Sequence, residues 1–171
     1  MKKLFILVIG PLLSAGCMTF TPPQTPNTIP QIKKTFVANY DTAWRQIIQG
    51  LTASGYVIDA QDKDTGIIRL QPFIHYNPSK EQAADMGDCG TLSQNWNFIK
   101  FTRQIIIKDN PAGIVTVQIK FDYMAYAIDN FLNQRWQPCF TTGHLEEKLL
   151  KEIAGLLTSP TNNKKTMDEN I

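Results

Sequence analysis

The stretch IVTVQIKFDYM, residues 114 to 124, decides the fold, because from its second residue it alternates between apolar and polar side chains. The apolar members are Val115, Val117, Ile119, Phe121 and Tyr123, and the polar members are Thr116, Gln118, Lys120 and Asp122. Successive side chains of a β-strand point to opposite faces, so one face of this strand is core and the other is wet. This pattern predicts an antiparallel sheet that packs on the core with one face.

Further strands and two helices are expected around this stretch. The other strands are predicted at residues 35–38, 56–61, 67–73 and 96–108. Turn formers at residues 62–66 and 109–113 join them into hairpins. Helical periodicity at residues 40–51, with Asn39 or Asp41 as N-cap and Gly55 as stop, and again at residues 144–157, predicts the helices. The expected fold is a single α+β domain, an antiparallel sheet of about five strands with two helices packed on one face and one disulfide.

The N-terminus has the features of an export signal. Lys2 and Lys3 precede a short apolar run at residues 4–13 and the small residues 14–16, which is typical of a secretory signal peptide. The run is shorter than the about 20 residues of a membrane-spanning helix. An ordinary signal peptide with an incidental cysteine is one interpretation of this segment.

The other interpretation comes from Ser14-Ala15-Gly16-Cys17, which resembles the lipobox of bacterial lipoproteins. The resemblance implies removal of residues 1–16 and acylation of Cys17, which would anchor the protein to the lipid bilayer. Met18 stands where an aspartate favours inner-membrane retention in enterobacterial lipoproteins. The expected location is therefore the outer membrane, with the domain facing the periplasm.

Composition places one domain between two polar segments. Residues 17–34 hold four prolines among Thr, Gln and Asn, which predicts an extended tether, and residues 158–171 are expected to be a disordered tail. The domain is therefore expected at residues 35–157. Without Lys2 and Lys3 the chain carries 15 basic and 15 acidic residues, and it shows no concentrated basic face. We expect no nucleic-acid partner.

Cys89 and Cys139 remain once Cys17 is acylated. In an oxidising periplasm they are predicted to pair with each other. The alternatives are two reduced thiols or metal ligands, but zinc needs four ligands and the chain has no CxxC or HxxxH spacing. We expect no metal and no cofactor.

Two segments, residues 74–95 and 125–142, are long for loops of a compact domain and each holds one of these cysteines. The aromatic residues of the two segments that are expected to form a partner-binding face are Tyr76, Tyr126, Phe131 and Trp136. Aromatic side chains are enriched at the centres of protein interfaces. The alternative is that they cap the open end of the core.

Other conspicuous residues have structural explanations. Trp44 falls at a core position of the first helix, and Asp62 and Asp64 fit turn chemistry better than a calcium loop. The charged residues near the end of the chain are expected to form a solvated helix face; they are Glu146, Glu147, Lys148, Lys151 and Glu152. A nucleophilic set of Cys89, His75 and Asp88 is disfavoured by the expected disulfide.

The segment NYDTAWRQIIQGLTASGYVIDAQDKDTGIIRL, residues 39–70, resembles the small α+β domains of Gram-negative envelope lipoproteins, such as the lipoprotein C subunit of the outer-membrane β-barrel assembly machinery. The resemblance implies fold and compartment. No catalytic motif is visible, so we expect a non-enzymatic assembly, scaffold or accessory module that contacts another envelope protein. A carrier of a small ligand or lipid, with its pocket between the sheet and the C-terminal helix, is the alternative; an envelope hydrolase is a weaker one.

Overall fold

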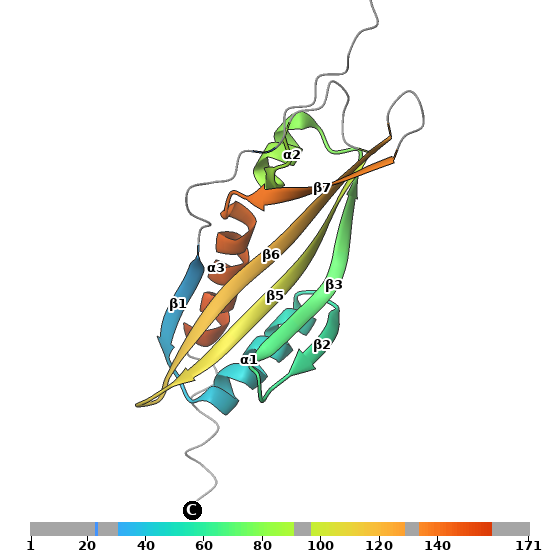
Figure 1. The fold of residues 1–171 in the computed structure, drawn as a ribbon. Helices are drawn as coiled ribbons and strands as arrows, with labels where there is room; N and C mark the ends of the chain where they lie inside the picture. Colours follow the sequence, from blue (N-terminus) through green and yellow to red (C-terminus); the bar gives the residue numbers. More distant parts are fainter. Residues whose placement is uncertain (1–22, 24–30, 91–96, 129–133, 159–171) are drawn as a thin grey trace, which may run out of the picture.

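The computed structural model describes residues 23, 31–90, 97–128 and 134–158 (Figure 1). The predicted signal peptide, Cys17, residues 17–22 and 24–30 of the predicted tether, Phe131 and the predicted tail beyond Thr158 lie outside these residues, whereas residues 32–34 of the tether belong to a strand.

The described chain is α+β with an antiparallel sheet, as predicted. Its elements are β1 (Ile32–Val37), α1 (Tyr40–Ala53), β2 (Ile58–Asp62), β3 (Ile67–Tyr76), α2 (Lys80–Met86), β4 (Gly87–Asp88), β5 (Phe98–Asn110), β6 (Ile114–Ile128), β7 (Gln134–Thr141) and α3 (His144–Thr158). The sheet runs in the order β2-β3-β5-β6-β7-β4, and β1 also pairs with β6. Strands β1 and β7 share one edge of β6, because β1 pairs with residues 114–119 and β7 with residues 123–128.

The first helix begins and ends where the sequence indicates. The side-chain oxygen of Asn39 accepts from the backbone N–H groups of Asp41 at 3.0 Å and Thr42 at 3.3 Å, which makes Asn39 the N-cap. Gly55, just after the helix, has φ +83°, a left-handed conformation that favours glycine. The helix buries Trp44 as predicted.

The turn between β2 and β3 is fixed by Asp62 and Gly66. The Asp62 Oδ1 accepts from the backbone N–H groups of Asp64 and Thr65, at 3.0 and 3.2 Å. Gly66 has φ +73°, and a Cβ there would lie 2.0 Å from the backbone oxygen of Ile107. The turn role predicted for Asp62 is confirmed, and residue 66 must be glycine for β5 to approach so closely.

The core lies between one face of the sheet and the helices α1 and α3, which lie on the same side of it (Figure 1). The odd-numbered residues of β5 and β6 face the helices; those with at most 3% exposure are Ile99, Ile105, Ile107, Val115, Val117, Ile119, Tyr123 and Ala125. They meet Ile47 of α1 and Ile153 of α3, both fully buried. We call this the helix side and the other the open side.

Three elements lie inside the segments expected to be loops. Residues 74–95 contain α2 and β4, and residues 125–142 contain the end of β6 and all of β7. The sheet therefore has seven strands among the described residues rather than about five, and three helices rather than two. β7 escaped prediction because Pro138 disfavours a strand interior. Helix α2 is short, although Ser79 and Gln82 form a capping box that marks its start.

Candidate functional site

Four aromatic residues stand in register across four neighbouring strands. Tyr76 of β3 pairs with Phe98 of β5, Phe98 pairs with Tyr126 of β6, and Tyr126 pairs with Trp136 of β7. Directly opposed residues of paired strands project from the same face. We call these four residues the aromatic row.

The rings of the aromatic row contact one another. Their centroids are 6.0 Å apart for Tyr76 and Phe98, 4.5 Å for the stacked pair Phe98 and Tyr126, and 4.9 Å for Tyr126 and Trp136. Phe98 also meets Trp136 edge-on at 5.3 Å. These separations are those of favourable aromatic pairs, each contributing about 0.5–1.5 kcal/mol beyond area burial. The row is therefore a rigid, continuous surface.

The aromatic row lies on the open side of the sheet. Tyr126 follows Ala125, which is fully buried on the helix side, and neighbouring residues of a strand point to opposite faces. Trp136 is 48% exposed and Tyr76 is 68% exposed, whereas Tyr126 is 9% exposed beneath its neighbours. The inner rings therefore support the row, and the outer rings present an apolar surface to solvent.

A second row extends this apolar surface along the strands. Ile74, Lys100, Met124 and Pro138 follow one another across the same four strands in register. Ile74 and Met124 are each 37% exposed, and Lys100 and Pro138 are also exposed. The surface is thus mainly apolar, with one lysine within it.

Three of the four residues predicted for a partner-binding face come together here. Tyr76, Tyr126 and Trp136 belong to the aromatic row, and Phe131 lies outside the described residues. Phe98 was missed, although it falls in a strand that the sequence predicts. Counting residue pairs from the Asn110–Ile114 end of the β5–β6 hairpin places Phe98 opposite Tyr126. The position of the hairpin turn in the sequence could therefore have identified Phe98.

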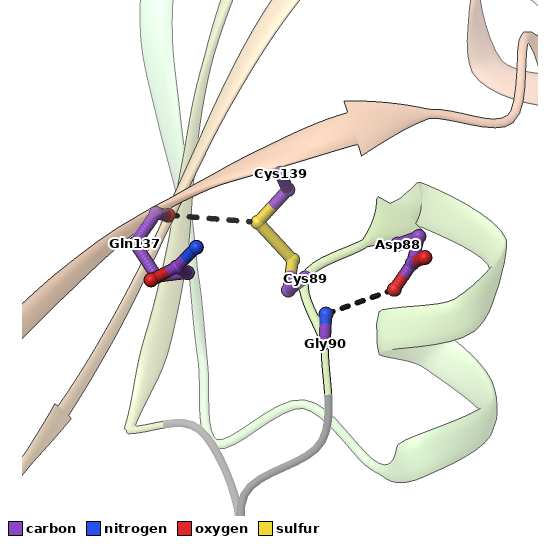
Figure 2. The surroundings of a disulfide bond; sticks show 5 residues. All are labelled: Asp88, Cys89, Gly90, Gln137 and Cys139. Atoms are coloured by element: carbon purple, nitrogen blue, oxygen red, sulfur yellow. Dashed lines mark hydrogen bonds between the residues drawn. A yellow bond between two sulfur atoms is a disulfide. The ribbon is translucent and has the colours of Figure 1, made fainter. Parts of the chain in front are cut away.

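The predicted disulfide between Cys89 and Cys139 is present, with their Cα atoms 4.2 Å apart (Figure 2). It links the segment after α2 to strand β7. Cys139 pairs with Tyr123, a helix-side residue, whereas Trp136 pairs with Tyr126 on the open side. The disulfide therefore fixes β7 from behind the aromatic row and is not part of the row's surface.

One carboxylate is buried behind the sheet, and this corrects a prediction. Glu146, expected on a solvated face of the last helix, is 2% exposed. Its Oε1 accepts from the Thr141 hydroxyl at 2.5 Å, and its Oε2 accepts from the Tyr123 hydroxyl at 3.4 Å. Burial raises the pKa of Glu146 and also that of Tyr123. Helical periodicity misplaced Glu146 because strand β7, which supplies Thr141, was not expected.

The structure also places the residues that the sequence offered for catalysis or metal binding. Cys89 is consumed by the disulfide, so it is no nucleophile for His75 or Asp88. Within the described ranges, no group of three His, Cys, Asp or Glu residues is arranged to hold a metal ion. No helix of the described chain combines the length and the apolar character needed to cross a bilayer.

Comparisons with known proteins give little further guidance. No family model matches the chain, and no curated protein matches it. Nine chains of solved structures match, among them a DUF4468 family protein from Bacteroides ovatus with 9% sequence identity and a TM-score of 0.39. That match covers 82% of this chain and 92% of the other. At this TM-score we draw no functional conclusion from the likeness.

Proposed function

We propose that the protein is a non-enzymatic binding module of the cell envelope that captures another envelope protein with the aromatic row. The row carries the proposal, because it brings four ordered aromatic rings into contact on a face that α1 and α3 leave open. Exposed aromatic clusters supported from below are typical of binding hot spots.

The dimensions of the surface fit a protein partner. Neighbouring strands are about 4.8 Å apart, so the row spans roughly 14 Å between β3 and β7. With the second row it offers a mainly apolar patch, bordered along the strands by the polar pair Thr102 and Asp122, which resembles the centre of a protein interface. A nucleic-acid partner is disfavoured, because the patch itself is apolar apart from Lys100, and other open-side cations such as Lys108 and Lys120 lie beyond it along the strands.

The compartment is the second part of the proposal. We propose that the chain is an outer-membrane lipoprotein held by acylated Cys17, with its domain in the periplasm. Its support is the sequence Ser14-Ala15-Gly16-Cys17 after a short apolar run, together with the disulfide, which suits an oxidising compartment. Replacing Cys17 with Ser should abolish radiolabelled palmitate incorporation and release the domain into the soluble fraction. Labelling that persists in Cys17→Ser contradicts the anchor.

The test of partner capture is crosslinking in native membranes followed by mass spectrometry. In a Tyr76→Ala/Trp136→Ala variant the yield of the crosslinked partner should fall about tenfold or more, because hot-spot side chains contribute at least 2 kcal/mol. The melting temperature should fall by some degrees, because each lost ring pair contributes about 0.5–1.5 kcal/mol, so capture is compared at a temperature at which the variant is folded.

Val57→Ala is the matched control, since Val57 is an apolar side chain with 57% exposure on the connection before β2. Its crosslinking yield should equal that of the wild type. A folded Tyr76→Ala/Trp136→Ala variant that captures the partner as well as Val57→Ala does would contradict the proposal. In that case the row is a cap over the end of the core, as the alternative interpretation holds.

A further inference from the structure

A cavity of about 230 Å³ opens on the helix side of the sheet, where the carrier hypothesis places a ligand. It lies between β5, β6 and α3. Its apolar walls are formed by Tyr56, Phe73, Phe101, Phe121, Leu145 and Leu149. One arginine, Arg103 of β5, contributes to the same wall. The cavity is thus a largely apolar recess whose sheet wall carries one cation, Arg103, while Lys148 and Glu152 of α3 also line it.

Arg103 is held in place by the aromatic wall. Its guanidinium carbon lies 5.1 Å from the ring centroid of Tyr56 and 5.9 Å from that of Phe101. One Nη2–H donates to the backbone oxygen of Gln71 at 3.1 Å. The two ring contacts are cation–π interactions. Together with the hydrogen bond to Gln71 they fix the direction of the guanidinium.

The guanidinium nevertheless lacks a counter-ion in the described part of the chain. The two ion pairs of that part are Lys63–Asp41 and Lys120–Asp122, so Arg103 takes part in neither. Glu152, at the rim of the cavity, instead accepts from the Tyr56 hydroxyl at 2.8 Å. The Nε of Arg103 is buried and has no hydrogen-bond partner. An unsatisfied buried donor costs about 1–3 kcal/mol, so this site is incomplete as it stands.

We propose that this cavity binds a small amphiphile with one carboxylate, whose carboxylate accepts hydrogen bonds from Arg103. Carboxylates suit the planar fork of arginine, and the apolar walls suit a hydrocarbon body. A volume of 230 Å³ corresponds to about eight waters at roughly 30 Å³ each, which fits a hydrocarbon chain of roughly eight carbon atoms. Lys148 and Glu152 are exposed on α3, so their flexible side chains can move to admit the head group.

A larger depression, about 630 Å³, lies beside the β2–β3 turn but is a weaker candidate. Its lining is mostly charged and includes Asp41 and Lys63, which pair with each other at 2.8 Å. The Tyr40 hydroxyl donates to the backbone oxygen of Lys63 there. Its principal polar groups therefore satisfy one another, in contrast to Arg103.

Octanoate is the probe that tests the proposal, with octanol and octylamine as matched compounds. Titrations of the folded protein, followed by amide chemical shifts, should show octanoate binding at β5 and α3 at least tenfold more tightly than octanol. Octylamine should bind most weakly, because it places a second cation beside Arg103. Equal affinity for octanoate and octanol would overturn the proposal.

The variants separate charge from shape. Arg103→Met should weaken octanoate at least tenfold and leave octanol unchanged, whereas Leu145→Trp should weaken both by filling the cavity. Arg45→Met is the control, because Arg45 is exposed on α1 and does not line the cavity; it should bind octanoate like the wild type. Arg103→Lys keeps the positive charge but lacks the planar guanidinium. It is the variant to test if Arg103→Met does not fold. A folded variant of Arg103 with wild-type preference for octanoate would refute the inference.

The site is independent of partner capture, because it lies on the helix side and the aromatic row lies on the open side. Failure of octanoate binding would therefore leave the proposed capture by the row intact, and the reverse also holds.

Discussion

The two faces of strands β5 and β6 carry the same backbone but different kinds of side chain. On the helix side, Ile105 and Val117 are fully buried against the helices. On the open side, Gln104, Lys120 and Asp122 are polar, and the apolar surface gathers at one end, in the aromatic row. The helix side builds the fold, and the open side leaves its ordered aromatic rings available for contact. Three predictions test whether the helix side alone stabilises the fold.

A large effect is expected where the disulfide anchors β7 from the helix side. Replacing Cys89 and Cys139 with Ser should lower the free energy of unfolding by up to about 4 kcal/mol, because the bond closes a loop of roughly 50 residues. Urea unfolding measures this change. As a control, unreduced wild-type protein should show no reactive thiol at these positions when denatured. A loss below about 1 kcal/mol would mean that pairing with β6 alone holds β7 in place.

The second prediction compares adjacent residues of one strand. Ile105→Ala should cost about 2–5 kcal/mol, because Ile105 is fully buried and its removal leaves a cavity. Ile106→Ala is the matched control on the open side, where Ile106 is only partly buried. Ile106→Ala should lower the free energy of unfolding by at least about 1 kcal/mol less than Ile105→Ala does. Equal losses in urea unfolding would show that the open side is as tightly packed as the helix side.

Much of this division could be predicted from the sequence. The alternation from Val115 to Tyr123 identified β6 and its buried face, because burial on one side of a sheet imposes a period of two. Helical spacing and the Asn39 cap identified α1 for the corresponding reason. These elements are decided by local patterns that do not depend on distant partners. For that reason they were found, although several ends differ, such as β1, which begins at Ile32 rather than Thr35.

The candidate sites depend on pairing between distant segments, and there the sequence was less informative. Trp136 meets Tyr126 only because β7, a strand that contains Pro138, pairs with the end of β6. Arg103 occupies a core-facing position of β5 that alternation would assign to an apolar residue. Such a residue draws no attention until its partners are known. The proposed ligand cavity is therefore marked by Arg103, a charged side chain where the alternation of the strand predicts an apolar one.

The smallest expected effect concerns Glu146, the one charged side chain that is buried among the described residues. Because burial raises its pKa above the ordinary value of 4.5, folding takes up a proton in the window between that value and the higher native pKa. The stability associated with protonated Glu146 is complete below pH 4.5 and is lost as the pH rises through the native pKa.

Glu146→Gln should abolish this dependence, since its neutral amide does not titrate. The amide oxygen can accept from one of the hydroxyls of Thr141 and Tyr123, and the amide N–H can donate to the oxygen of the other. The melting temperature of the wild type minus that of Glu146→Gln should therefore fall as the pH rises above 4.5. Taking the difference removes the contribution of the other carboxylates. Glu147→Gln, on the exposed neighbour, should keep most of the wild-type slope, because burial raises the pKa of Glu146 more than the charge of Glu147 does. A difference that rises with pH would mean that the hydrogen bonds to the ionised carboxylate outweigh its burial, and that Glu146 stabilises the helix side as a charged group.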